Sequence, residues 1–253
     1  MLEICNLTKS YDTKKAVDNL SFTVNDGELC AFIGHNGAGK TTTLKCVAGI
    51  LGFDGGSVTV DGISVADDPL EVKRRIAYIP DNPDLYDFMT GMQYLNFIAD
   101  IFGVSEEIRR ARIDKYGAAL SLSAEEIGSS ISTYSHGMKQ KLALISAFLH
   151  DPKLILLDEP FVGLDPKASH VLKEIMREFC KEGGAILFST HILEVAEKLC
   201  DKVVIIRGGK LVTSGSMEEV KGDSSLEDVF LDIDENPEDY APAPETEGDE
   251  DDA

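Results

Sequence analysis

The sequence has little positive charge for its length, which limits the partners it can bind. Among 253 residues, 24 Lys and Arg stand against 45 Asp and Glu, for a formal net charge of −21. Interfaces with nucleic acid need Lys and Arg to neutralise phosphates, so the composition argues against nucleic acid as a partner. Residues 232–253 contain eleven acidic residues and no basic one, and we expect this segment to be an acidic, disordered tail.

Paired cysteines and long apolar runs are also missing. The five cysteines form no CxxC pair, and most of them lie in apolar stretches. This pattern favours buried free thiols over disulfides or a zinc site. No run approaches the roughly 18 to 20 apolar residues that cross a bilayer, and the first residues lack the pattern of a signal peptide. We expect a cytosolic chain that reaches a membrane only through a partner.

Hydrophobic patterning predicts an α/β core with a helical insertion at 82–150. Strands that alternate with helices are typical of a parallel sheet covered on both faces. The predicted strands are 2–8, 20–24, 28–33, 57–60, 76–79, 154–157, 185–189, 202–206 and 210–213. The predicted helices are 39–50, 90–102, 106–120, 137–150, 167–182, 191–199 and 224–231.

A glycine-rich segment at 34–41 matches GxxxxGK[ST] in full, after an apolar strand and before a helix. Glycines let the backbone wrap around phosphates with its N–H groups pointing inward. Lys40 supplies a positive charge to the β/γ oxygens, and the Thr41 hydroxyl is a ligand for Mg²⁺. We therefore predict a site for ATP or GTP. Its contacting residues are Gly34, His35, Asn36, Gly37, Ala38, Gly39, Lys40, Thr41 and Thr42.

Two acidic residues follow the apolar run 154–157 and complete the prediction of a metal-assisted phosphate site. Asp158 is the predicted carboxylate on the magnesium side. Glu159 is placed to polarise a water for attack on the γ-phosphate. Buried adjacent acids are costly without a metal or hydrogen bonds. A plain helix N-cap is the alternative interpretation.

Two further residues are candidates on position alone. His191 ends another apolar strand and is predicted to donate a hydrogen bond to charge that develops on the γ-phosphate; a structural histidine is the alternative. Tyr11 precedes a polar loop and is a candidate to stack on the nucleobase. The segment 132–144, STYSHGMKQKLAL, places Ser135 and Gly137 at a helix start, which is a second place suited to bind an anion.

These motifs, in this order, resemble the ATP-binding subunits of ABC transporters over residues 1–231. The resemblance implies a P-loop ATPase with a mixed sheet core (1–81 and 151–231), an antiparallel β part and the helical subdomain 82–150. It implies ATP and Mg²⁺ as cofactors, with Tyr11 on adenine, Glu159 as general base and His191 as switch histidine. It identifies YSHGMKQ as the signature motif, in which Ser135 and Gly137 complete the site of another protomer, and FVGLDP as the D-loop with Asp165.

The sequence departs from the family pattern at two places. The usual LSGGQ reads Tyr134-Ser135-His136-Gly137-Met138, so His136 replaces the first glycine and either contacts phosphate or fills space. Asp81 stands where the Q-loop glutamine is expected. An aspartate still offers an oxygen to magnesium or water. Our hypothesis is that Asp81 keeps a role in metal binding and coupling.

The resemblance further implies a second ATPase subunit, identical or homologous, and an integral membrane permease. We expect the protein at the cytoplasmic face of the plasma membrane, bound through that permease, as in exporter-type, EcsA-like and multidrug, bacteriocin or lipid export ATPases. Four aromatic residues of the helical insertion are candidates for the permease contact, or else belong to its core: Tyr86, Phe88, Tyr94 and Phe97. A soluble ABC ATPase without a permease and a regulator without turnover are the alternatives.

Overall fold

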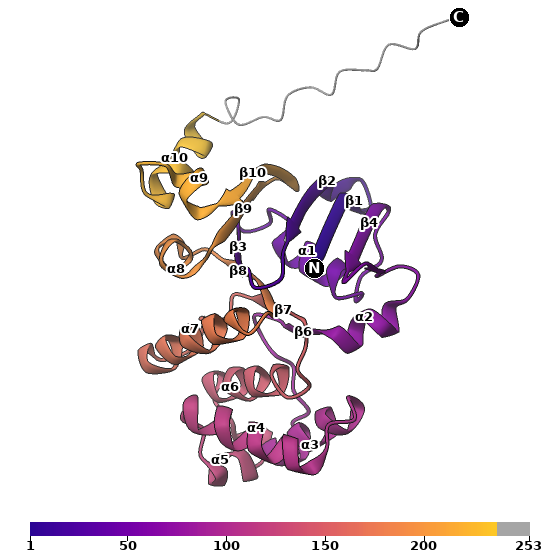
Figure 1. The fold of residues 1–253 in the computed structure, drawn as a ribbon, viewed down its shortest axis with the longest axis vertical. Coiled ribbons are helices and arrows are strands. Elements are labelled where there is room, and N and C mark those ends of the chain that lie inside the picture. The colour runs from indigo at the N-terminus through magenta and orange to yellow at the C-terminus, as the bar shows by residue number, and fades with distance from the viewer. Residues whose placement is uncertain (237–253) are drawn as a thin grey trace, which may run out of the picture.

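The computed structural model describes residues 1–236 and consists of two β-sheets with helices around them and a helical region at one end (Figure 1). The first sheet has the strand order β2-β1-β4-β5, and all of its pairs are antiparallel. Its strands are β1 (Leu2–Tyr11), β2 (Lys14–Val24), β4 (Gly55–Val60) and β5 (Ile63–Ser64).

The second sheet has the order β10-β9-β3-β8-β7-β6, in which only the β9–β10 pair is antiparallel. Its strands are β3 (Leu29–Ile33), β6 (Ile76–Ile79), β7 (Leu154–Asp158), β8 (Ala185–Thr190), β9 (Lys202–Arg207) and β10 (Lys210–Ser216). The carboxyl ends of β3, β8 and β7 therefore lie next to one another at one edge. In open α/β sheets this edge is where ligands bind.

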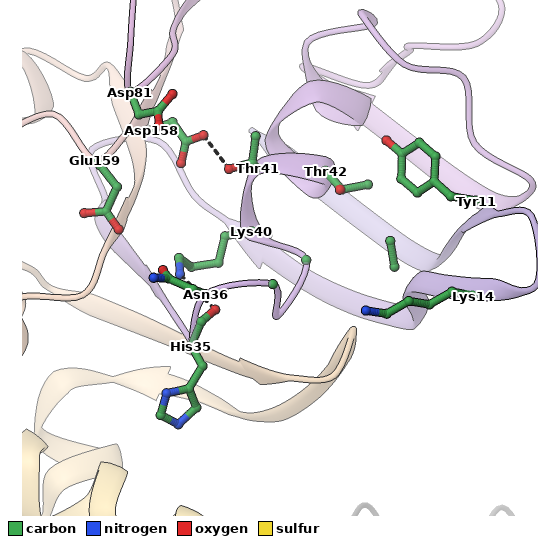
Figure 2. A pocket seen from close by; sticks show the side chains of 13 residues that line it. Tyr11, Lys14, His35, Asn36, Lys40, Thr41, Thr42, Asp81, Asp158 and Glu159 are labelled. Carbon is green, nitrogen blue, oxygen red and sulfur yellow. Dashed lines mark hydrogen bonds between the residues drawn. The ribbon is translucent and has the colours of Figure 1, made fainter.

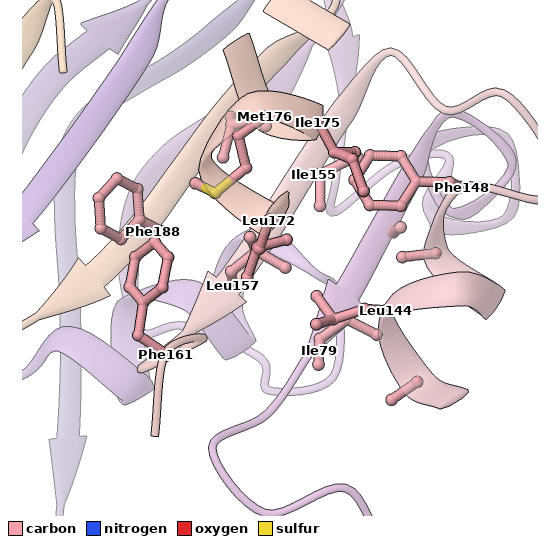
Figure 3. Packing of buried hydrophobic residues seen from close by; sticks show 14 of the residues in the cluster. Ile79, Leu144, Phe148, Ile155, Leu157, Phe161, Leu172, Ile175, Met176 and Phe188 are labelled. Carbon is pink, nitrogen blue, oxygen red and sulfur yellow. The ribbon is translucent and has the colours of Figure 1, made fainter. Parts of the chain in front are cut away.

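Both faces of the second sheet are covered, and this explains its continuous apolar strands. One face packs on α6 (His136–Ala147), α7 (Pro166–Lys181) and α8 (Leu193–Leu199), as Figure 3 shows for α7 and neighbouring side chains. The other face and the first sheet enclose α1 (Lys40–Val47) in a second apolar cluster. The five cysteines are free and four of them are buried, as the sequence predicted.

Helices α3 to α6 form the region at the bottom of Figure 1. Short polar side chains start them: Thr90, Ser105 and Ser123 each accept a hydrogen bond from a backbone N–H of the first turn, which is the usual N-cap arrangement. The new elements here are α3 (Gly91–Ile101), α4 (Glu106–Ala119), α5 (Ala124–Gly128) and the 3₁₀ turn η1 (Ile131–Thr133).

The structure corrects some boundaries. Patterning missed three short helices, α2 (Pro69–Arg75), α5 and α9 (Met217–Lys221), and it missed β5 and the first part of β2. The last helix, α10 (Leu226–Glu235), continues past residue 231, so residues 232–235 are helical and the tail cannot start at 232. Burial of Ile233 explains the extension, because this apolar residue holds the last turn against the core. The rest of the expected tail, 237–253, lies outside the described residues.

Candidate functional site

The glycine-rich loop connects β3 to α1 and wraps around the Lys40 side chain. The Lys40 ammonium donates hydrogen bonds to the carbonyl of Gly34 at 2.5 Å and to that of His35 at 3.3 Å. Gly39 has a φ of +110°, and a Cβ there would collide with the carbonyl of Ala16. Burial lowers the pKa of Lys40, and the nearby carboxylates of Glu159 and Asp158 oppose that shift. A buried ammonium held only by carbonyls is suited to bind phosphate oxygens.

Asp158 ends β7 and bonds directly to the first turn of α1. The Thr41 hydroxyl donates to Oδ2 of Asp158 at 2.6 Å, and the Ser189 hydroxyl donates to Oδ1 at 2.5 Å. Asp158 is only 2 % exposed. A hydroxyl and a carboxylate side by side are hard oxygen ligands of the kind Mg²⁺ prefers. The donor set therefore fits the ion that the sequence predicted.

This metal site needs further ligands from a nucleotide. In residues 1–236, no group of three or more His, Cys, Asp or Glu side chains is arranged to hold a metal ion. Mg²⁺ in phosphate-transfer sites is typically bound by one or two carboxylates together with the phosphates of the substrate. Thr41 and Asp158 alone would not complete the coordination of Mg²⁺, and phosphates of a bound nucleotide would supply further ligands.

Glu159 follows β7 in a strained backbone conformation. Its φ is +48°, which non-glycine residues rarely adopt. Its N–H group donates to the hydroxyl and to the carbonyl of Ser189, at 3.0 and 3.2 Å, which fixes the turn. The side chain accepts a hydrogen bond from Nδ1 of His191 at 2.9 Å. The Glu159 carboxylate therefore contacts His191, whereas the carboxylate of the adjacent Asp158 contacts Thr41 and Ser189.

A cavity of about 380 Å³ collects most of the predicted nucleotide residues (Figure 2). Tyr11 forms one end, and Asp81, Asp158 and Glu159 form the other (Figure 2). Between them lie His35, Asn36, Gly37, Gly39, Lys40, Thr41 and Thr42. The cavity therefore has an aromatic side chain at one end, acidic side chains at the other and Lys40 between them.

Three predicted residues lie just outside this cavity. Gly34 and His191 line a neighbouring cavity of about 350 Å³, which also borders Glu159. Ala38 is buried, and its backbone holds the loop: its N–H donates to His35 and its carbonyl accepts from Gly209, at 3.0 and 2.9 Å. Ala38 thus supports the loop in this structure, whereas Gly34 and His191 border the site.

Ser135 and Gly137 lie apart from the cavity, at the start of α6. The Ser135 hydroxyl caps the helix by accepting from the N–H of Met138 at 3.3 Å. A Cβ on Gly137 would come within 2.7 Å of the Gly163 carbonyl, and the His136 ring packs against Gly163. His136 is exposed and lies against Gly163 of its own protomer, and its contact with the phosphate of another protomer stays a prediction. Neither Ser135 nor Gly137 lines the cavity around Lys40.

Sequence reasoning missed Lys14, Ser189 and the contact between His35 and the last helix. Lys14 lines the cavity near Tyr11, at the start of β2 and just after the turn that follows β1. Ser189 precedes His191 by two residues, and its place at a strand end was the one available signal. The partner of His35 is Asp234, 199 residues away. No sequence pattern near either residue predicts this contact.

A phosphate-binding loop between β3 and α1, with Asp158 at the end of β7, defines a P-loop NTPase. The family model for ABC transporters matches residues 17–162. The chain belongs to this family and is an ATP-binding protein and ATPase of the ABC type. None of the helices in residues 1–236 is long and apolar enough to span a membrane.

Relatives and solved structures agree with this assignment. The chain is 34 % identical to the ABC-type transporter ATP-binding protein EcsA of Bacillus subtilis, over 92 % of this chain and 96 % of the relative. A solved ATP-binding subunit of an ABC transporter has a TM-score of 0.88 and 36 % identity, covering 92 % of this chain and 99 % of its own. The fold also matches, with a TM-score of 0.79 at 22 % identity, the dimeric post-hydrolysis structure of the cassette MJ0796 bound to ADP and Pi; the match covers 86 % and 99 % of the chains.

Proposed function

We propose that this chain is the ATP-hydrolysing subunit of an ABC transporter and that its two described cavities form one half of a shared ATP site. The observation that carries the proposal is the convergence of Lys40, Thr41, Asp158 and Glu159 on one cavity, with His191 bonded to Glu159. These residues come from three neighbouring strand ends of the parallel sheet.

The cavity supports a specific binding pose. Tyr11 is 48 % exposed at its rim, with the Lys9 ammonium 5.6 Å from the centre of its ring, and the exposed part of the ring is placed to stack on adenine. The P-loop N–H groups and Lys40 bind the phosphates. Mg²⁺, held by Thr41 and Asp158, neutralises phosphate charge when it is bound. When phosphate oxygens bind to Lys40, its hydrogen bonds to the loop carbonyls break.

Hydrolysis in this proposal uses Glu159 as the general base. Its carboxylate takes a proton from a water as the water oxygen attacks the γ-phosphorus. The bond to the bridging oxygen breaks, which leaves ADP and phosphate. His191 Nδ1 holds the carboxylate in place, and its Nε2 side is left to face the γ-phosphate. Asp81, at the acidic end of the cavity, is placed to bind a water or the metal ion.

A second ATPase subunit completes the site. Ser135 and Gly137 stand at the tip of α6, outside the cavity of their own protomer. The helix N-terminus there offers N–H groups and a positive dipole end to an anion. We assign this anion to the γ-phosphate on the P-loop of the partner subunit. The dimeric cassette that shares this fold carries ADP and Pi, which supports an assembly of this kind.

The exposed aromatic side chains of the helical region support a permease contact. Phe88 is 81 % exposed, and Tyr86 and Phe97 are also exposed, whereas Tyr94 packs partly into the core. The Tyr86 ring lies 5.6 Å from that of Phe88 and 5.8 Å from that of Phe97. An aromatic cluster joined to the cavity by the short segment 81–86 is suited to receive a cytoplasmic helix of an integral membrane permease.

The proposed location is therefore the cytoplasmic face of the plasma membrane, where the protein is attached through the permease. The proposed direction of transport is export. The similarity to the ABC-type transporter ATP-binding protein EcsA supports the role in a transporter, and the direction follows from the resemblance of the motifs to exporter-type ATPases. The second candidate is a soluble ABC ATPase that shares this nucleotide site and works without a permease. Purification from membranes under mild detergent tests this: a co-purifying protein of several apolar helices supports the transporter, and an ATPase recovered alone supports the second candidate.

A further inference from the structure

The last helix of the described chain touches the phosphate-binding loop. Nε2 of His35 lies 2.7 Å from Oδ2 and 2.9 Å from Oδ1 of Asp234, and the His35 ring centre is 4.8 Å from that of Phe230. Asp234 and Phe230 both belong to α10. Figure 2 shows the His35 ring pointing away from Lys40. His35 thus joins the second position of the loop to a helix at the other end of the sequence.

This end of α10 is held firmly. The Arg207 guanidinium, at the end of β9, donates to the carbonyl of Ile233 at 2.7 Å and lies 3.9 Å from the Asp234 carboxylate. The Ile233 side chain is buried. At the start of the helix, the N–H of Leu226 donates to the Glu197 carboxylate at 3.0 Å. Both ends of the helix are therefore fixed by hydrogen bonds, and this fixes the position of Asp234 next to the phosphate-binding loop.

The backbone of His35 is part of the phosphate loop itself. Its carbonyl accepts from the N–H of Ala38 at 3.0 Å and from the Lys40 ammonium at 3.3 Å. Holding the His35 side chain therefore restricts the backbone that carries Lys40 and the phosphate-facing N–H groups. Phe230 also forms a wall of the 350 Å³ cavity that borders Glu159 and His191. The helix α10 thus adjoins the site on the γ-phosphate side.

We propose that Asp234 is a positioning residue for ATP binding, which acts through His35 to hold the phosphate-binding loop ready for phosphate. A loop that is already ordered loses less conformational entropy when the nucleotide binds. The inference rests on the proposed nucleotide site and extends it to α10, which carries no phosphate-binding motif. It makes the C-terminal helix a determinant of nucleotide affinity.

The test compares Asp234→Asn with Glu235→Gln as its matched control. Glu235 is the adjacent acid and is exposed, so its variant removes the same charge without a loop contact. Isothermal titration with MgATP, in a Glu159→Gln background that prevents turnover, gives the Kd. The contact is partly exposed, so we expect Asp234→Asn to raise the Kd only about 2- to 5-fold. Glu235→Gln should leave it unchanged.

A double-mutant cycle separates positioning from a purely structural role. In a His35→Asn background, Asp234→Asn should cause no further rise in Kd, because its partner is already gone. An equal rise in both backgrounds, or no rise in either, overturns the proposal. Lys40→Ala is measured beside them. If it abolishes binding while Asp234→Asn has no effect, only the α10 inference fails; if Lys40→Ala binds MgATP normally, the proposed nucleotide site fails as well.

Discussion

Nδ1 of His191 lies 2.9 Å from Oε2 of Glu159, so the proposed switch histidine and the proposed general base form one hydrogen-bonded unit. Glu159 is further fixed by two hydrogen bonds from its N–H to Ser189. The histidine side chain is largely exposed, whereas that of Glu159 is only 17 % exposed. The pair therefore presents a sheltered carboxylate to the cavity, with its backbone fixed by Ser189 and its side chain bonded to His191.

Glu159→Gln should abolish hydrolysis and keep ATP binding. The amide has almost the same shape as the carboxylate but cannot take a proton from water. We expect kcat to fall by about 10² to 10⁴-fold, the usual contribution of a general base. Steady-state ATPase assays and titration with MgATP measure the two effects. Glu182→Gln, on an exposed residue at the end of α7, is the control; normal turnover in Glu159→Gln would remove Glu159 as the base.

Thr41→Val should weaken Mg²⁺ more than it weakens ATP. Valine has nearly the volume of threonine but lacks the hydroxyl that bonds Asp158 at 2.6 Å. Removing one of two protein ligands should raise the Mg²⁺ concentration for half-maximal ATPase about 10-fold or more, in the range found for the loss of groups that support a metal site. Titration of Mg²⁺ at saturating ATP measures this. An unchanged requirement would contradict the assigned ligand.

Asp81→Ala should lower the ATPase activity and its stimulation by the permease. Asp81 lines the acidic end of the cavity and also begins the segment that leads to Tyr86 and the aromatic cluster. The Asp81 carboxylate accepts from the N–H of Asn82 at 2.8 Å, which orders the start of this segment. ATPase assays with and without the permease test the role. Unchanged, permease-stimulated turnover would end the hypothesis that Asp81 couples the two.

Phe88→Ala should uncouple transport without harming the fold. Phe88 is 81 % exposed, so its truncation leaves no cavity in the core. We expect unchanged Tm and basal ATPase activity, but loss of permease binding. Phe102→Ala is the matched control, because the Phe102 ring stacks on that of His150 at 3.7 Å. It should destabilise the helical region by about 1 to 2 kcal/mol, because Phe102 is half-buried and loses its stacking contact. A similar loss of stability in Phe88→Ala would place Phe88 in the core instead.

The sequence predicted the elements whose chemistry is local. The loop 34–41 carries its own glycines, lysine and threonine, and the strand before Asp158 is a continuous apolar run, so both were found directly. Patterning failed where the signal is short or set by neighbours. Helices α2, α5 and α9 are seven residues or fewer. The polar half of β2 is a strand because it pairs with β1 at the edge of its sheet.

Contacts between distant parts of the chain could not be predicted from the residues. Nothing around His35 shows that Asp234 contacts it, because the contact depends on how α10 packs on the core. Likewise, nothing in the sequence around His136 shows that its ring lies against Gly163. The separation of Ser135 from its own cavity is a property of the whole fold, and the resemblance to ABC ATPases was needed to expect it.

Mixing two inactive variants tests the shared ATP site most directly. Lys40→Ala removes phosphate binding, and Ser135→Asp repels the γ-phosphate while it keeps a good helix N-cap. Each variant alone should be inactive. A mixed dimer, however, has one intact site, so an equal mixture should recover about a quarter of wild-type ATPase activity if protomers exchange freely between symmetric dimers. A mixture as inactive as its components would contradict a site built from two protomers.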